Sequence, residues 1–186
     1  LGPNQQDIWQ LNRTAPQLTV YHLPVRISLP RGTTADVMRA VLRDLTERHD
    51  ALRTVMPEID GAPVAKVLDA EAAPVDLRIV EEALDEAAVR TFVDEPFELT
   101  TQLGWRCLLS VAGDVVELVL VAHHAMVDGW SIGILIREAQ QALAARIAGD
   151  APHWSTPVST TTPPRPTFVP PSRCRSTPRA PERSSS

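Results

Sequence analysis

The most continuous apolar stretch in the chain lies at residues 115–122, where every residue except Glu117 is apolar and β-branched residues are frequent. Such a run predicts a strand that is buried on both faces. Residues 132–147 follow it with the apolar spacing of an amphipathic helix. The stretch between them, from His123 to Ser131, is therefore a strand end, a loop and a helix start, where α/β folds commonly place their chemistry.

The other patterns before residue 150 alternate between helices and strands. Periodicity predicts helices over 3–11, 35–48 and 84–93, and strands over 21–29, 52–56, 64–68, 75–80 and 103–111. Thr33 or Thr34 can cap the second helix. Asp60-Gly61 is a hairpin signal, and a turn at residues 112–114 makes the strands on either side of it antiparallel neighbours. This mixture of elements predicts an α/β fold.

The composition changes abruptly after residue 150. Residues 151–186 hold nine of the 17 prolines and are rich in Ser, Thr and Arg, without any periodic apolar pattern. We therefore predict a folded unit over residues 1–150 and a disordered tail over residues 151–186. Two explanations of the tail stay open: translation of a GC-rich gene in a shifted frame, and a natural flexible linker.

The composition also narrows the class of protein. The chain has 186 residues, of which 44% are hydrophobic, enough for one domain with a real core. A formal net charge of −5 argues against a nucleic-acid partner. No apolar run is long enough for a transmembrane helix, and the N-terminus lacks a signal-peptide pattern. Two cysteines are too few for a disulfide framework or a cysteine zinc site, so we expect a cytoplasmic protein with reduced thiols and no membrane contact.

The end of the apolar strand carries the candidate chemistry. His123 and His124 are adjacent, so their side chains leave a strand on opposite faces, and only one of them can face a given cavity. Each shares its parity with apolar residues of the strand, so the spacing does not choose between them. Asp128 can orient a histidine or pair with an arginine, and Gly129 permits a positive φ or the close approach of a ligand.

Four interpretations of this stretch compete. The histidines can be structural, with Asp128 as a helix cap. A metal site is disfavoured, because the histidines face opposite ways and no further cluster of His or Cys is at hand. A serine hydrolase is also disfavoured, although residues 129–133 spell G-x-S-x-G, because the motif lies too far from the strand end and only His153 follows it. The fourth interpretation is acyl transfer with a histidine as general base.

A family resemblance favours acyl transfer. Residues 123–131 have the pattern HHxxxDG followed by Trp-Ser, which closely resembles the core motif of condensation domains of nonribosomal peptide synthetases. Residues 48–54 resemble the RHExLRT motif of these domains, with Asp50 in place of Glu. Residues 96–99 resemble their Pro-Phe-Asp-Leu signature, with Glu98 in place of Asp.

Two further features refine the resemblance, which covers residues 3–150. The spacing from Gln5 to Trp9 is similar to the first motif of condensation domains. Epimerisation domains, the nearest rival in the superfamily, usually read Ser-Trp after the core motif, whereas this chain reads Trp130-Ser131. Cyclisation domains carry aspartates in place of the histidines. The Trp-Ser order therefore favours condensation over epimerisation, and the two histidines disfavour cyclisation, while an epimerisation or other acyltransferase member of the superfamily remains the alternative.

The resemblance implies a fold. Condensation domains belong to the chloramphenicol acetyltransferase-like acyltransferases, so we expect a two-layer α/β sandwich with a mixed sheet. In this family two such lobes face each other across the active site. Residues 1–150 correspond to the N-terminal lobe alone, and the C-terminal lobe is missing from the chain. The alternative to an active enzyme is therefore a truncated lobe that folds without catalysing.

The resemblance also implies a reaction. An acyl or peptidyl thioester from an upstream carrier protein is transferred to the amine of a downstream aminoacyl group, which makes an amide bond. Both groups travel on 4'-phosphopantetheine arms, so the partners are the two peptidyl carrier proteins and the adjacent synthetase domains. No cofactor and no metal is expected to bind this chain directly.

Roles inside the core motif follow from the same resemblance. His124 is the central catalytic or positioning residue, and His123 is structural. Asp128 holds the loop, and Gly129 lines the tunnel through which the substrates meet.

The resemblance also suggests two partners for the carboxylate of Asp128. Arg53 is the second arginine of the RHExLRT-like motif, which the family ties to this aspartate. Arg106 lies in the predicted strand 103–111, at a position where the family usually has an arginine. A buried carboxylate without such a partner is costly, so one of these two arginines is expected to bind it.

Overall fold

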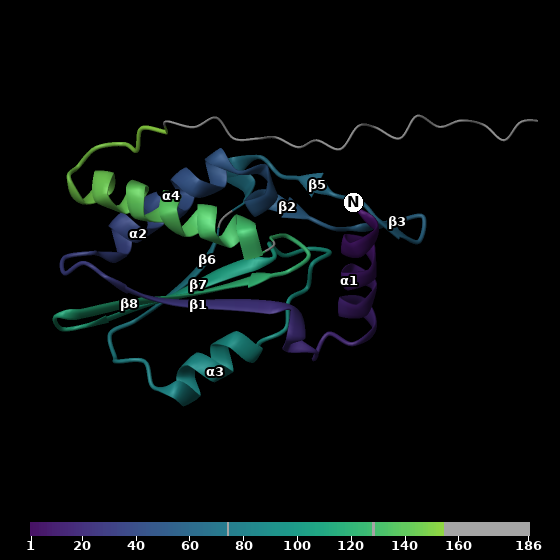
Figure 1. The fold of residues 1–186 in the computed structure, drawn as a ribbon, viewed down its shortest axis with the longest axis horizontal. Coiled ribbons are helices and arrows are strands. Elements are labelled where there is room, and N and C mark those ends of the chain that lie inside the picture. The colour runs from purple at the N-terminus through teal and green to yellow at the C-terminus, as the bar shows by residue number, and fades with distance from the viewer. Residues whose placement is uncertain (74, 128, 155–186) are drawn as a thin grey trace, which may run out of the picture.

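A mixed four-stranded sheet forms the centre of the protein (Figure 1). The computed structural model describes residues 1–73, 75–127 and 129–154. The strands lie in the order β1, β8, β7 and β6, with the bounds His22–Leu29, Val115–His123, Trp105–Ala112 and Asp76–Val80. β8 pairs antiparallel with β1 and β7, whereas β6 runs parallel to β7. The predicted antiparallel neighbours and the mixed sheet are both confirmed.

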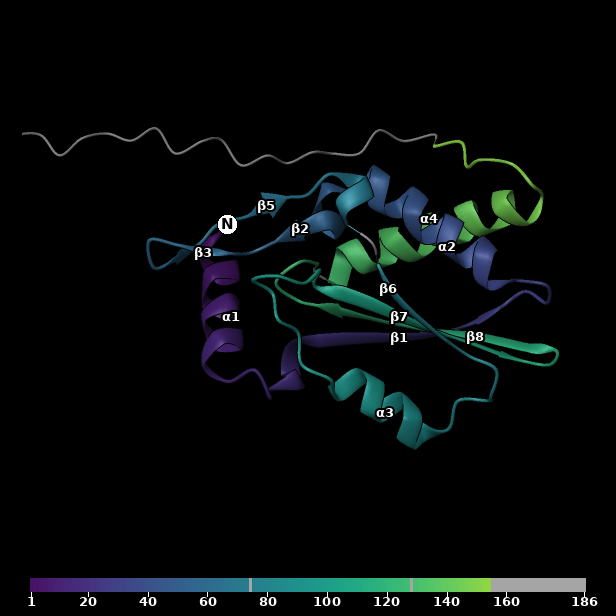
Figure 2. The same ribbon diagram turned by 180° about the vertical axis from the view of Figure 1, so that it is seen from behind.

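Helices lie against both faces of this sheet. α2 (Ala35–Arg48) and α4 (Gly129–Ile147) lie side by side on one face, and α3 (Glu86–Asp94) lies on the other (Figures 1 and 2). α1 (Pro3–Thr14) stands at the end of the sheet where β8 ends. The predicted α/β class is thus confirmed, with the α2–α4 layer packed on the sheet as its main part. No helix in the described ranges is long and apolar enough to cross a membrane.

Two small strand pairs precede the main sheet's β6 in the sequence. β2 pairs with β5 and β3 with β4, with the bounds Thr54–Val55, Lys66–Val67, Glu58–Ile59 and Ala62–Pro63. Asp60 and Gly61 join β3 to β4 with φ values of 52° and 80°, the positive values that a two-residue hairpin turn needs. The hairpin is confirmed, but the strands predicted over 52–56 and 64–68 are only two residues long. The first is shortened because Pro57 follows it and supplies no backbone donor.

β8 supplies two apolar cores with alternate side chains. Its even-numbered residues from Leu118 to Ala122 pack with α2 and α4. Its odd-numbered residues Val119 and Val121 pack on the opposite face, with residues of α1 and α3. The prediction of a strand that is buried on both faces is therefore confirmed. His123 has the parity of Val121, so its side chain lies on the α3 face.

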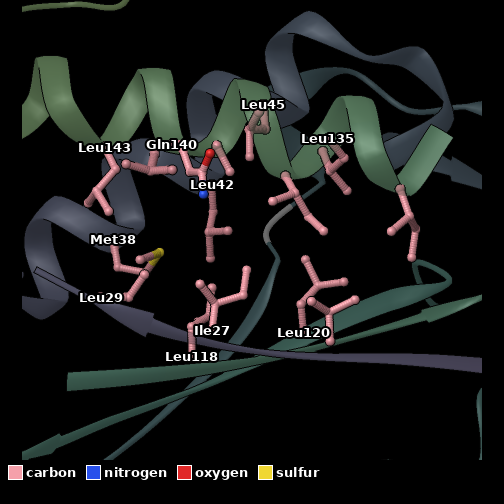
Figure 3. A pocket seen from close by; sticks show the side chains of 15 residues that line it. Ile27, Leu29, Met38, Leu42, Leu45, Leu118, Leu120, Leu135, Gln140 and Leu143 are labelled. Atoms are coloured by element: carbon pink, nitrogen blue, oxygen red, sulfur yellow. The ribbon is translucent and has the colours of Figure 1, made fainter. Parts of the chain in front are cut away.

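A narrow apolar crevice remains between the sheet and the two helices that cover it (Figure 3). Its walls are side chains of β1, β8, α2 and α4 that point toward one another, among them Ile27, Leu120, Met38 and Leu135. Its volume is about 40 Å³, well below the ~150 Å³ of a cavity that holds benzene. The crevice is therefore a gap in the packing and not a substrate site.

The folded unit extends past the predicted boundary at residue 150. Gln141 donates a hydrogen bond to the carbonyl of His153. The Trp154 ring stacks on the Arg48 guanidinium, whose Cζ lies 4.6 Å from the ring centroid, and packs against the α2–α4 core. Residues 151–154 therefore belong to the folded unit, which corrects the predicted start of the tail. The remaining residues of that predicted tail lie outside the described ranges.

Ending the chain after Asp150 should lower the melting temperature, whereas ending it after Trp154 should leave the melting temperature unchanged. The shorter chain loses the stacking of Trp154 on Arg48, a contact worth about 0.5–1 kcal/mol at exposed sites, together with the apolar area that the ring buries. Thermal unfolding followed by circular dichroism compares both chains with the full protein. A marked loss in the chain that ends at Trp154 would show that residues beyond it pack against the body.

Candidate active site

The candidate site lies where β8 ends and the chain turns into α4. Residues 124–127 are the described part of the five-residue connection, in which the Met126 and Val127 N–H groups donate to the His123 carbonyl at 2.9 and 3.4 Å. Asp128 lies outside the described residues, so its predicted role in holding the loop stays a prediction. Gly129 begins α4. Sequence proximity thus places both histidines at one end of the sheet, as predicted.

His123 is enclosed by protein. Its side chain is 1% exposed, and its ring centroid lies 5.7 Å from that of His22 and 5.9 Å from that of Phe97. The Ala125 N–H donates to its Nδ1 at 3.2 Å, so Nδ1 is an acceptor and the ring is neutral, with its proton on Nε2. Burial, helped by repulsion from the neighbouring histidines, lowers the pKa of His123 to about 4. The His123 ring is therefore neutral near pH 7 and shielded from solvent.

His124 meets a different environment, although it is the next residue. Its N–H donates to the Tyr21 carbonyl at 2.8 Å, which continues the pairing of β8 with the segment before β1. The Tyr21 ring lies edge-on to the His124 ring, with 6.4 Å between centroids. The side chain is half-buried, and within the described part of the chain no hydrogen bond engages its ring nitrogens. His124 is therefore the histidine of this pair that a substrate can reach.

The loop is held from outside by α1. Gln5 donates its amide to the Ala125 carbonyl at 3.0 Å, a contact between residues far apart in the sequence. α1 is itself fixed, because the buried Trp9 donates to the Met56 carbonyl at 3.0 Å and Asn12 donates to the Phe97 carbonyl at 3.2 Å. The sequence signal for Gln5 was its place in the first motif, but its contact with the loop was not predicted.

Arg106 supports the site through an aromatic ring. It is 3% exposed in β7, and its Nη2 donates to the carbonyls of Phe92, at 2.9 Å, and Glu95. Its Cζ lies 4.0 Å from the centroid of Phe97, the same ring that contacts His123. Burial lowers the pKa of Arg106, but an arginine stays charged at any physiological pH.

Arg53, the other predicted partner of Asp128, lies in the 3₁₀ turn Asp50–Arg53. Its Nη2 donates to Asp50 at 2.5 Å, and its Nη1 donates to the Leu68 carbonyl at 2.5 Å. These contacts fasten the turn to the small β2–β5 pair. Because Asp128 lies outside the described residues, its pairing with either arginine is untested.

Two ion-pair clusters fasten α4 to α2. Arg48 Nη2 lies 3.0 Å from one carboxylate oxygen of Glu138, and His49 Nε2 lies 2.5 Å from the other. Further along the helices, Arg146 donates to Asp44 at 2.7 Å. Burial alone would raise the pKa of Glu138, but the hydrogen bonds from Arg48 and His49 hold it below the usual value. Arg48 and His49 of the RHExLRT-like motif thus support the site, because they fix α4, the helix that follows the loop.

Sequence reasoning missed this clamp, although the charges were in view. Asp44 and Arg48 are four residues apart on α2, and Glu138 and Arg146 are eight apart on α4, so each set lies on one helix face. The signs of the charges on the two faces are complementary. Only the packing of the two helices shows that these faces meet.

Comparisons with known proteins agree with this geometry. The family model described as the condensation domain matches residues 1–153. A nonribosomal peptide synthetase named CymA from Salinispora arenicola is 39% identical over 154 residues, which make up 81% of this chain and 2% of that protein. The isonitrile lipopeptide synthase of Mycobacterium tuberculosis is 35% identical over 165 residues, 81% of this chain and 6% of that protein. The chain spans only a few per cent of the length of these relatives.

Solved structures give the same result for the fold. The X-domain in complex with OxyB, from teicoplanin biosynthesis, matches with a TM-score of 0.74 and 30% identity, over 83% of this chain and 34% of that one. The starter condensation domain of rhizomide synthetase RzmA matches with a TM-score of 0.73 and 20% identity, over 83% of this chain and 39% of that one. At that identity the second match bears on the fold alone.

Replacing Glu138 with Gln should destabilise the protein strongly. The carboxylate is 11% exposed and binds Arg48 at the end of α2 and His49, the residue after it, and breaking a buried pair costs about 3–5 kcal/mol. Asp114→Asn is the matched control, because its ion pair with Arg31 is 75% exposed on both sides and such pairs contribute about 0–1 kcal/mol. Urea unfolding of both variants measures the difference. Equal losses would show that the clamp contributes no more than a surface pair.

Mild acid should destabilise the fold through His22 and His123. Burial lowers the pKa of both rings below 6.5 in the folded protein. Their stabilising contribution is therefore complete above pH 6.5, and it falls as the pH drops below that value because only the unfolded chain takes up the protons. For His123 the loss continues down to about pH 4, the pKa of its ring in the folded protein, at up to about 1.4 kcal/mol per pH unit.

Urea unfolding at pH 7, 6 and 5 measures this slope. His22→Gln should reduce the slope, while His153→Gln, at an exposed position, should leave it unchanged. A slope that is the same in all three proteins would contradict the assignment of the acid sensitivity to the buried pair.

Proposed function

This chain belongs to the condensation-domain family, and from that premise we propose that it is the N-terminal lobe of a domain that forms amide bonds in nonribosomal peptide synthesis. The upstream acyl or peptidyl group and the downstream aminoacyl group are both thioesters on 4'-phosphopantetheine arms. The partners are therefore the two carrier proteins and the adjacent synthetase domains. The observation that carries the proposal is the unequal histidine pair: His123 is covered and neutral, and the half-buried His124 ring has no hydrogen bond to any described residue.

The chemistry requires one basic group at the point of attack. As the amine nitrogen attacks the thioester carbonyl, an N–C bond forms and the nitrogen must lose a proton. The C–S bond then breaks, and the departing thiolate takes up a proton. An imidazole whose ring nitrogens are free can accept the first proton and return it to the sulfur. In this proposal His124 performs that step, and its position is supported by the hydrogen bond of its N–H to the Tyr21 carbonyl at 2.8 Å.

The other motif residues act by holding this group in place. His123 is structural, since protonation of its Nδ1 would remove the acceptor of the Ala125 N–H. Asp128 holds the loop by pairing with an arginine, for which Arg53 and Arg106 remain the proposed partners. Gly129 lines the substrate tunnel at the start of α4.

The alternative is a lobe that folds but does not catalyse. The chain spans 34% and 39% of the two solved domains that it resembles, and the proposed active site lies between two lobes. Turnover with carrier-loaded substrates separates the two functions. A chain that is inactive alone, but active when residues 1–154 are joined to a second lobe from a relative, would be a catalytic half-domain. Inactivity in both forms would favour the non-catalytic lobe.

In such a two-lobe domain, His124→Ala should abolish most turnover without lowering the melting temperature. Removal of a positioned acid–base group typically costs about 10²–10⁴-fold. His123→Ala should instead lower the melting temperature, because it empties a position that is 1% exposed. Asp128→Ala should lower both, since loss of one partner of a buried pair costs about 3–5 kcal/mol.

Turnover and thermal unfolding are measured for all three variants, with His153→Ala as the control at an exposed position. Near-normal turnover of His124→Ala would refute its assigned role. A His123→Ala variant that is fully stable yet inactive would exchange the roles of the two histidines.

A further inference from the structure

Gly104 lies immediately before β7, and its backbone leaves no room for a side chain. A Cβ at this position would lie 2.3 Å from Met126 Cγ and 3.2 Å from Leu99 Cδ2, whereas carbon atoms pack at about 3.5–4.0 Å. Its φ is not among the positive values that favour glycine. The reason for a glycine here is therefore space, and the space is filled by Met126 from the candidate loop.

Met126 cannot make room by moving only its tip. The position of Cγ is set by the backbone and the first side-chain torsion, so displacing Cγ moves the whole side chain or the loop itself. The side chain also packs against both apolar cores, on the two faces of the sheet. An outward swing would thus remove Met126 from two sets of contacts, so a displacement of the loop is the remaining response.

Gly104 contacts the loop on both sides of His124. Its carbonyl accepts from the His123 N–H at 2.7 Å, one residue before His124. Its empty side-chain position receives Met126, two residues after His124. Between these points the turn is short, with the Met126 N–H bonded to the His123 carbonyl at 2.9 Å. A shift of Met126 must therefore be absorbed between His123 and Met126, in a segment that includes His124 and its half-buried ring.

We propose that Gly104 is a positioning residue for His124. Because Gly104 has no side chain, it leaves a notch, the space of a missing Cβ, that Met126 fills, and the placement of Met126 sets the orientation of the His124 ring. The inference rests on the proposed catalytic role of His124. Gln5 holds the Ala125 carbonyl from the opposite element, α1, at 3.0 Å. The ring is thus set between a fixed helix on one side and the start of β7 on the other.

The test uses the 186-residue chain and no turnover, so its outcome is independent of the assay that tests the function. The cross-relaxation between the Tyr21 and His124 rings, whose centroids lie 6.4 Å apart, is recorded by NMR. Gly104→Ala should lose the Tyr21–His124 cross-peak. Gly133→Ala is the matched control, because nothing lies within 4 Å of a Cβ there, and it should leave the cross-peak unchanged.

Rescue separates positioning from general damage. Met126→Ala removes the Cγ that the new Cβ would meet, so Gly104→Ala combined with Met126→Ala should recover the cross-peak that Gly104→Ala alone has lost. Met126→Ala by itself empties the notch and should also weaken the cross-peak, which keeps the proposal testable if Gly104→Ala does not fold. A wild-type cross-peak in Gly104→Ala, or in Met126→Ala, would overturn it.

Discussion

The site depends on the double pairing of β8. Because β1 and β7 occupy both of its edges, β8 has no free edge, and its side chains are buried on both faces of the sheet. His123 is the last residue held in this way, opposite His22 of β1 and bonded through its N–H to Gly104. His124 is the first residue beyond the strand. The two adjacent histidines thus meet different environments: burial keeps the His123 ring neutral, whereas the His124 side chain is only half-buried.

Distant contacts, rather than the loop itself, determine where the site lies. A five-residue connection between a strand and a helix is fixed only if both of its ends are fixed. The strand end is fixed by sheet pairing, and the helix is fixed by Glu138 and Arg146, which bind charges on α2. Gln5 adds a third support from α1. Gln5, Arg48 and His123 come from three motifs far apart in the sequence and all take part in these contacts, which gives a physical reason for the motifs to occur together.

Apolar periodicity predicted the elements well where it was long. The buried strand, the helix over 35–48 and the antiparallel pair around residues 112–114 all have the expected positions. Strand parity could not choose between His123 and His124, because it assigns them to opposite faces that are both apolar, and their roles followed only from the family resemblance. In the structure the Ala125 N–H bonds to the ring of His123, whereas the His124 side chain, just past the end of β8, is half-buried.

The partners of Arg53 and Arg106 could not be predicted from the sequence either. Both guanidinium groups donate hydrogen bonds to backbone carbonyls, which every residue carries. Residue type therefore gives no hint of such a partner. The clamp on Glu138 needed the relative placement of two helices, which charge patterns on each helix alone do not contain. The start of the tail was misplaced for a similar reason, since a single aromatic residue, Trp154, docks on the core after a run without periodicity.

As the single lobe that we propose, the chain leaves the proposed base open on one side, and this limits what it can do alone. Water competes with the amine for a thioester, and acyl-transfer sites suppress this competition by excluding water. His124 is half-buried, and just before its neighbour Tyr21 the side chains of Leu18 and Val20 are 44% and 74% exposed. Apolar side chains exposed beside a polar site are typical of an interface. In the two-lobe domain that we propose, a second lobe packed on this segment would cover the apolar side chains and the base together, so that desolvation of the surface and protection of the thioester come from the same contact.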